Sequence, residues 1–217
     1  MWHALWVIAG YLLGSIPTAY LAGRWLKGID LREYGSGTVS GTGVIYHVGI
    51  GAGVLAGLFD VAKGAFIPWL ARQWGAPLPV LLLAGLAAVV GHNWPLYLGF
   101  KGGRGISPFM GMMLVVFPWG VLWLLAFLAI GRLLKYTALV AFCGILTLPL
   151  LTYIAGQPTA VTLASVGMLL ITAIKRLEAN CLPLPSGPER RRVLLRRLFL
   201  DRDVSANEEW VLRRPGN

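Results

Sequence analysis

Apolar segments long enough to cross a bilayer recur along this 217-residue chain, and they constrain its fold more than any other feature. A membrane-crossing helix needs about 20 mostly apolar residues. Residues 106–117 form a shorter apolar stretch. We interpret it as a separate span because the turn signal Pro118-Trp119-Gly120 follows it. Only 13% of the residues are charged, which excludes an ordinary water-soluble or disordered protein. The sequence predicts an all-α polytopic membrane protein with seven transmembrane helices, at 4–24, 50–72, 78–98, 106–117, 118–134, 137–155 and 159–175.

The basic residues predict the orientation of these spans, because Lys and Arg are enriched in cytoplasmic loops. With seven crossings, the segments after spans one, three, five and seven share one side. They hold all of the 19 basic residues except Lys63 and Arg72. We therefore expect the N-terminus outside and the C-terminus inside. No basic n-region or small-residue cleavage site indicates a cleavable signal peptide.

Asp60 and Lys63 are charged residues inside the second span, at i and i+3 on one helical face. Such residues are normally paired or face a polar cavity. Two interpretations stay open: an internal ion pair that fixes helix packing, or a pair that lines a polar site. Few other acidic residues precede residue 177, so a proton or metal pathway built from carboxylates is not indicated.

Two glycine-rich segments on the basic side carry the candidate chemistry. In residues 30–43, four glycines alternate with small hydroxyl residues, an arrangement that lets backbone N–H groups converge on an anion, although a flexible connector has the same composition. In residues 91–107, Lys101 and Arg104 flank a Gly-Gly pair, which suits a phosphate group. His92 is either a base or a packed histidine. Together the two loops predict a phosphate-handling site, and the scattered Cys and His residues predict no metal.

The sequence of these segments resembles that of the bacterial acyl-phosphate-dependent glycerol-3-phosphate acyltransferases, the integral membrane PlsY family. The resemblance covers roughly residues 7–189. It rests on Tyr11-Leu-Leu-Gly-Ser-Ile-Pro, Gly28-Ile-Asp-Leu-Arg, Gly35-Ser-Gly, Asp60-Val-Ala-Lys-Gly and Phe100-Lys-Gly-Gly-Arg-Gly, with Asn180, Gly187 and Glu189 at the spacing of the terminal motif.

The resemblance implies a seven-helix bundle in the bacterial inner membrane with its active loops facing the cytoplasm. The implied reaction transfers a fatty acyl group from acyl phosphate to the 1-hydroxyl of glycerol 3-phosphate, giving lysophosphatidic acid, with no cofactor and no metal. The implied partners are these two substrates and membrane lipids. The implied catalytic residues are Ser36, Lys101, Arg104 and Asn180, the last as a hydrogen-bond donor to substrate. The implied substrate-binding and phosphate-binding residues are Arg32, Gly35, Gly37, Thr38, Thr42, His92, Gly102, Gly103 and Gly105.

The sequence also departs from the family pattern at several positions. Thr38, Gly43 and Tyr46 stand where the family has Asn, Asn and Arg, and Leu177 and Pro183 stand where it has His and Arg. Serines expected after Lys135-Tyr136 are replaced by alanines such as Ala138 and Ala141. Two hypotheses follow: a divergent enzyme with substrate-assisted proton transfer, or a non-catalytic relative that binds phospholipid or a partner on the same scaffold. A transporter is less favoured because no inverted repeat is visible.

The chain therefore divides into a bundle over residues 1–189 and a basic cytoplasmic tail over residues 190–217. The tail begins Arg190-Arg-Arg-Val-Leu-Leu-Arg-Arg-Leu-Phe-Leu, which mixes basic pairs with apolar clusters. This pattern predicts an interfacial amphipathic helix that binds lipid headgroups rather than nucleic acid.

Overall fold

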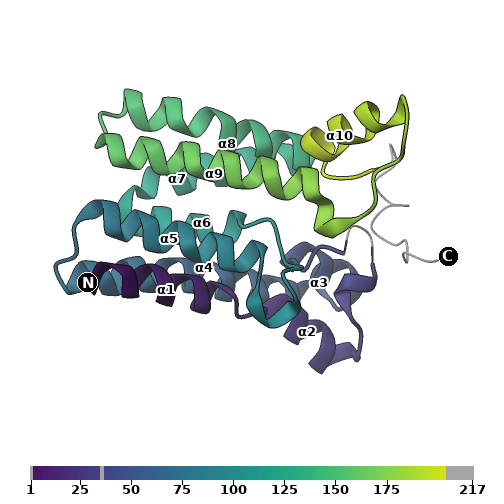
Figure 1. Cartoon of the computed structure of the whole chain (residues 1–217), viewed down its shortest axis with the longest axis horizontal. Helices are drawn as coiled ribbons and strands as arrows, with labels where there is room; N and C mark the ends of the chain where they lie inside the picture. Colours follow the sequence, from purple (N-terminus) through teal and green to yellow (C-terminus); the bar gives the residue numbers. More distant parts are fainter. Residues whose placement is uncertain (1, 35–36, 204–217) are drawn as a thin grey trace.

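The computed structural model describes residues 2–34 and 37–203, and within these ranges the regular structure is helical. The long helices lie side by side, with the N-terminus at one end of the bundle and α10 at the other (Figure 1). The α-helices are α1 (Trp2–Gly14), α2 (Thr18–Lys27), α3 (Gly41–His47), α4 (Ile50–Gln73), α5 (Leu78–Asn93), α6 (Ile106–Val116), α7 (Pro118–Leu133), α8 (Thr137–Ile154), α9 (Thr159–Glu178) and α10 (Glu189–Leu200). Short 3-10 turns lie at Leu31–Glu33, Leu96–Leu98 and Ala179–Cys181.

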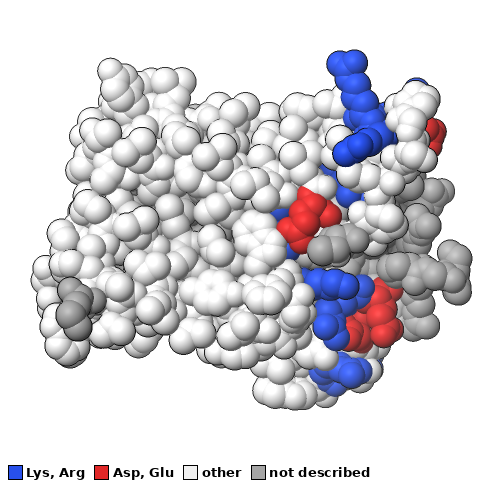
Figure 2. Space-filling model, viewed as in Figure 1, with Lys and Arg blue, Asp and Glu red and all other residues white. Residues whose placement is uncertain are grey.

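Five helical segments of the described chain are long and apolar enough to cross a membrane: Trp2–Lys27, Ile50–Gln73, Leu78–Leu98, Thr137–Ile154 and Thr159–Glu178. The apolar helices α6 and α7 are shorter. Large apolar side chains such as Phe59, Trp119 and Ile154 are exposed on the outside of the bundle, as expected where lipid is the solvent. Figure 2 shows that the charged residues visible on one face gather at the end that holds α2, α3 and α10.

The first predicted span, 4–24, is interrupted: α1 ends at Gly14 and α2 begins at Thr18. Proline has no backbone N–H and disfavours helical backbone at the preceding residue, so Pro17 interrupts the helix after Ser15 and Ile16. An apolar segment long enough to span is confirmed at Trp2–Lys27, but it consists of two helices rather than one, because the apolar run continues across the interruption.

The third and fourth predicted spans also end or divide at prolines. Helix α5 ends at Asn93 rather than continuing to residue 98, because Pro95 follows two residues later and disfavours helical backbone at Trp94. The predicted division between 106–117 and 118–134 is confirmed, with α6 and α7 separated at Phe117. Arg72 Nη1, at the end of α4, donates a hydrogen bond to the carbonyl of Val115 at 3.2 Å. The α6–α7 junction therefore lies at the same end of the bundle as the α4–α5 turn.

Small residues allow the helices around the interruption to pack closely. Gly10 and Gly14 of α1 face the backbone of Ala84 and Ala88 on α5, and a Cβ atom at either glycine would overlap a carbonyl oxygen. Close backbone approach through small residues is a common packing mode of membrane helices. It fixes α1, and with it the interruption at residues 15–17, against α5.

The first part of the basic segment forms helix α10, and one of its arginines is buried in the protein. Helix α10 packs against α8 and α9. Arg197 is only 1% exposed and donates hydrogen bonds to the carbonyls of Leu177, Leu182 and Pro183. Arg190, Arg191 and Arg192 are exposed. Arg197 therefore anchors the helix, and headgroup binding by the exposed arginines of this segment stays a prediction.

Candidate active site

Asp60 joins three helices through its buried carboxylate, which is 2% exposed. Its Oδ1 accepts a hydrogen bond from Thr18 Oγ1 at 2.6 Å and lies 2.8 Å from Lys63 Nζ. His92 Nδ1 lies 3.4 Å from the same oxygen. A charge removed from water needs close partners. The cluster therefore holds the start of α2 and the end of α5 against the middle of α4.

Lys63 also connects this cluster to the interruption between α1 and α2. Its Nζ donates a hydrogen bond to the carbonyl of Ile16 at 2.9 Å. An interrupted helix leaves carbonyls without their usual intrahelical partner, and in an apolar surrounding each such group needs another donor. The backbone N–H of Thr18 donates to the Ile16 carbonyl at 3.1 Å, and Lys63 supplies a second, charged donor, so the ion pair and the irregular backbone of the first span belong to one arrangement.

His92 connects the cluster to the Gly102–Gly103 segment. Its carbonyl accepts a hydrogen bond from Gly103 N at 3.0 Å. A Cβ atom at Gly103 would overlap the His92 imidazole, and one at Gly102 would overlap the His92 carbonyl oxygen. The loop can lie this close to α5 only because both positions are glycine.

The two glycine-rich segments found in the sequence lie side by side. Val39 N donates a hydrogen bond to the carbonyl of Gly102 at 3.2 Å. Asn180 Nδ2 donates to the carbonyls of Gly37 and Gly102, at 2.8 Å and 3.2 Å. The side-chain amide of Asn180, which is 5% exposed, therefore holds the first loop, the second loop and the end of α9 together.

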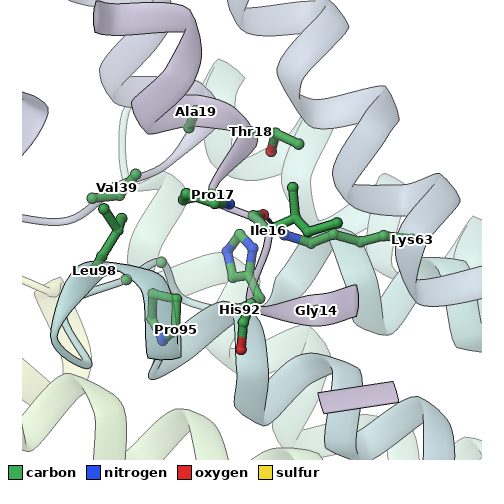
Figure 3. Close-up of a pocket in the computed structure, with 13 residues that line it drawn as sticks. Gly14, Ile16, Pro17, Thr18, Ala19, Val39, Lys63, His92, Pro95 and Leu98 are labelled. Carbon is green, nitrogen blue, oxygen red and sulfur yellow. Dashed lines mark hydrogen bonds between the residues drawn. The ribbon is translucent and has the colours of Figure 1, made fainter. Parts of the chain in front are cut away.

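A small, partly open cavity lies where these parts meet (Figure 3). The interrupted first span supplies one wall, and the side chains of Lys63 and His92 approach it from α4 and α5. Its lining residues are Gly14, Ser15, Ile16, Pro17, Thr18, Ala19, Val39, Lys63, His92, Pro95, Leu98, Gly102 and Gly103. The backbone of the Gly102–Gly103 segment lies beside the Lys63 ammonium and the His92 imidazole in this lining. Such a surrounding suits an anionic ligand.

Residues 4–182 match the family model described as glycerol-3-phosphate acyltransferase. The chain belongs to the glycerol-3-phosphate acyltransferase family. Glycerol-3-phosphate acyltransferase 4 of Dehalococcoides mccartyi (strain CBDB1) is 38% identical over 211 residues, which cover 94% of this chain and 91% of that protein. Glycerol-3-phosphate acyltransferase of Synechococcus sp. (strain CC9902) is 42% identical over 183 residues, covering 84% of this chain and 91% of that protein.

Two crystal structures of PlsY (YgiH), an integral membrane glycerol 3-phosphate acyltransferase, are similar to this chain. Its glycerol 3-phosphate form is 30% identical with a TM-score of 0.77, over 95% of this chain and 96% of that one. Its lysophosphatidic acid form is 31% identical with a TM-score of 0.73, over 82% and 89%. The expected family is confirmed, and the chain is an integral membrane protein of the acyltransferase family.

The positions of the predicted site residues in this acyltransferase-family chain fall into four groups. Lys63, His92, Gly102 and Gly103 line the cavity. Gly37, Asp60, Gly105 and Asn180 support its walls, and Gly105 is the N-cap residue of α6, with a φ of 76° that favours glycine. Gly35 and Ser36 lie outside the described residues. The remaining predicted residues, Arg32, Thr38, Thr42, Lys101 and Arg104, do not line the cavity.

Arg32 is held by Asp30 rather than by the cavity. Its Nη2 lies 2.6 Å from Asp30 Oδ2, and its guanidinium stacks over the Tyr20 ring at 5.1 Å. The hydrogen bond from Arg32 holds the pKa of the Asp30 carboxyl below its usual range, and the same contact raises the pKa of Arg32. This pair fixes the turn that opens the first glycine-rich loop.

Lys101 and Thr42 are exposed, whereas Arg104 is 8% exposed and has two protein partners. Arg104 Nη1 donates to the carbonyl of Lys175 at 2.8 Å. Its Nε and Nη2 face the carboxylate of Asp201, at 3.1 Å and 2.9 Å. Among the described residues, no group of three or more His, Cys, Asp or Glu side chains is arranged to hold a metal ion.

Three contributors to the site were missed from the sequence. Thr18 binds Asp60, the carbonyl of Ile16 binds Lys63, and Asp201 binds Arg104. The Gly14-Ser-Ile-Pro17 segment carried a usable signal, because a proline inside an apolar span frees backbone groups that need partners. No local signal in the sequence pairs Arg104 with a residue 97 positions away.

Proposed function

We propose that this chain is a glycerol-3-phosphate acyltransferase that uses acyl phosphate as its donor. The observation that carries the proposal is the cavity between the two hydrogen-bonded glycine loops, next to Lys63 and His92. It is supported by family membership and by the similarity to PlsY in its glycerol 3-phosphate and lysophosphatidic acid forms. Glycerol 3-phosphate and acyl phosphate are the proposed substrates, and the acyl chains and the product lie among membrane lipids.

In the proposed reaction, the 1-hydroxyl oxygen of glycerol 3-phosphate attacks the acyl carbonyl carbon. The bond from that carbon to the phosphate oxygen breaks, and the hydroxyl proton passes to the leaving phosphate. The protein holds the two phosphates and offsets developing charge, the kind of preorganised stabilisation that contributes most in many enzymes. Backbone N–H groups of the two glycine loops and the cations of Lys101 and Arg104 are the groups proposed for this work, with Ser36 and Asn180 beside them.

We further propose that the apolar segments make seven crossings, with the N-terminus outside and the active loops in the cytoplasm of a bacterium. The helices α6 and α7 then each cross the membrane. This is supported by the Arg72–Val115 hydrogen bond, because the α6–α7 junction and the α4–α5 turn share one end. Residues 1–189 form the bundle, and residues 190–217 form a cytoplasmic tail whose exposed arginines contact headgroups.

A second candidate function is a non-catalytic relative that binds phospholipid or a partner without turnover. It is favoured by the replacement of the family's His and Arg at Leu177 and Pro183, and by the pairing of Arg104 with Asp201. A leucine cannot donate a hydrogen bond, and a lost arginine removes a bidentate phosphate ligand.

Phosphate release from palmitoyl phosphate, measured with and without glycerol 3-phosphate, distinguishes the acyltransferase from the non-catalytic relative. Purified wild type is expected to release phosphate only when glycerol 3-phosphate is present, and palmitoyl-CoA is expected not to replace the donor. Lys101→Ala is expected to lower the rate at least about tenfold, the cost typical of losing one charge-stabilising group. Arg132→Ala, which removes an exposed cation elsewhere, is the matched control. Phosphate release by the wild type that is no faster than release by Lys101→Ala contradicts the enzymatic proposal. A higher rate in Leu177→His would show that the leucine in place of the family's histidine lowers activity.

A further inference from the structure

Asp201 binds the guanidinium of Arg104, the group that the proposed site would use to bind a phosphate. Its two carboxylate oxygens face Nη2 and Nε of Arg104, at 2.9 Å and 3.1 Å, and the two side chains are 22% and 9% exposed. Oδ2 accepts a hydrogen bond from Nε, whereas Oδ1 is close to Nη2 as an ion pair only. A carboxylate and a phosphate both bind a guanidinium through charge-assisted contacts. Both ligands cannot use that edge of Arg104 together.

Helix α10, which is anchored to the bundle, holds Asp201 next to Arg104. Asp201 directly follows α10 in the left-handed conformation, and its N–H donates to the carbonyl of Arg197 at 3.1 Å. Two buried arginines fix that helix. Arg197 binds the carbonyls of Leu177, Leu182 and Pro183, and Arg176 Nη1 donates to the carbonyl of Leu198 at 2.8 Å.

Arg104 in turn belongs to the loop that forms the cavity wall, directly after Gly102 and Gly103. We propose that residues 189–203 form a strap whose Asp201 competes with the substrate phosphate for Arg104. This inference rests on the proposed function for the identity of the anion. A tethered carboxylate acts as a ligand at roughly millimolar effective concentration. A phosphate ligand must displace it, so the strap weakens apparent substrate affinity.

Binding of glycerol 3-phosphate, measured by isothermal titration on the full chain in detergent micelles, tests the strap without requiring turnover. Asp201→Asn keeps the side-chain size and is expected to lower the Kd about threefold or more, since its amide competes poorly for a guanidinium. Asp203→Asn is expected to lower the Kd as well, because Asp203 pairs with Arg197 and helps to hold α10. Glu33→Gln, which removes an exposed negative charge from another segment, is expected to leave the Kd unchanged.

A double-mutant cycle separates competition from a general charge effect. On an Arg104→Gln background, Asp201→Asn is expected to change the Kd no further. An unchanged or higher Kd in Asp201→Asn overturns the strap. A Kd that Asp201→Asn still lowers on the Arg104→Gln background also overturns it. If Asp201→Asn does not fold, Asp203→Asn decides by the same criterion.

The failures of the two proposals differ. A wild type that binds glycerol 3-phosphate but releases no phosphate from palmitoyl phosphate contradicts the proposed function and leaves the strap standing. An active enzyme whose Kd does not respond to Asp201→Asn contradicts the strap alone. Absence of binding in both wild type and Asp201→Asn overturns both.

Discussion

Asn180 connects two loops that are far apart in the sequence. Its side-chain nitrogen donates to the carbonyls of Gly37 and Gly102, and the role of hydrogen-bond donor to substrate that the resemblance implies stays a prediction. A buried amide with both donors used specifies one arrangement of its surroundings. At the scale of a single residue, Asn180 therefore determines the shape of the site rather than touching the cavity.

Asn180→Asp tests this role, because the aspartate keeps the size but places a carboxylate opposite two carbonyl oxygens. Leaving buried acceptors unpaired costs roughly 1–3 kcal/mol each. We expect the acyl-transfer rate to fall at least about tenfold and the thermal midpoint to fall with it, both measurable on purified protein in micelles. A variant with lower activity but wild-type stability would instead assign Asn180 to the substrate.

Gly102 is the second residue that determines the site, since any side chain there meets the carbonyls of His92 and Asn93 and the Pro95 ring. We expect Gly102→Ala to displace the loop and to abolish glycerol 3-phosphate binding in a titration. Gly57→Ala is the matched control, because a Cβ atom there meets nothing within 4 Å and its φ is helical. Equal behaviour of the two variants would contradict the close approach of the loop to α5.

At the scale of elements, the interruption of the first span and the Asp60–Lys63 pair depend on each other. Apolar length predicted the span but not its interruption, because the residues on both sides of Ser15–Pro17 continue the same apolar run. Of the two interpretations of the ion pair, the structure combines both: it joins helices, and Lys63 lines the cavity. Pro17 marks this stretch of backbone as irregular, but no sequence pattern pairs the carbonyl of Ile16 with Lys63.

Lys63→Met should therefore destabilise the protein strongly, because it leaves Asp60 buried without its close cation. Removing one member of a buried pair costs about 3–5 kcal/mol, whereas removing both is far less costly. In an SDS titration that follows unfolding, we expect Lys63→Met to unfold earliest and Asp60→Asn with Lys63→Met to recover part of the loss. A single variant as stable as wild type would indicate that the pair contributes nothing to packing.

At the scale of the whole molecule, the sequence predicted an all-helical membrane protein and the gathering of charged residues at one end of it, whereas the seven crossings and their orientation stay predictions. Local patterns carry both, since apolar runs and basic loops are contiguous in the chain. The pairing of Val39 with Gly102 and of Arg104 with Asp201 joins distant segments, and only the packed bundle brings them together. The loop residues Gly35 and Ser36 lie outside the described residues, so their predicted roles stay predictions.

The number of crossings can be checked with single cysteines on a background without Cys143 and Cys181. With seven crossings, Gln73→Cys and Ala155→Cys should react with a membrane-impermeant maleimide in intact cells. Lys135→Cys and Arg191→Cys should react only after permeabilisation. If α6 and α7 formed one crossing, Arg191→Cys would react in intact cells.

The close packing of α1 on α5 also has a consequence for biosynthesis. Gly10 and Gly14 fit against Ala84 and Ala88, about seventy residues later in the chain. At a synthesis rate of about 5–20 residues per second, the first helix enters the bilayer on the order of ten seconds before its partner exists. During that interval α4 arrives first, and Lys63 can cover the exposed carbonyl of Ile16 while the remaining face of α1 stays in contact with lipid.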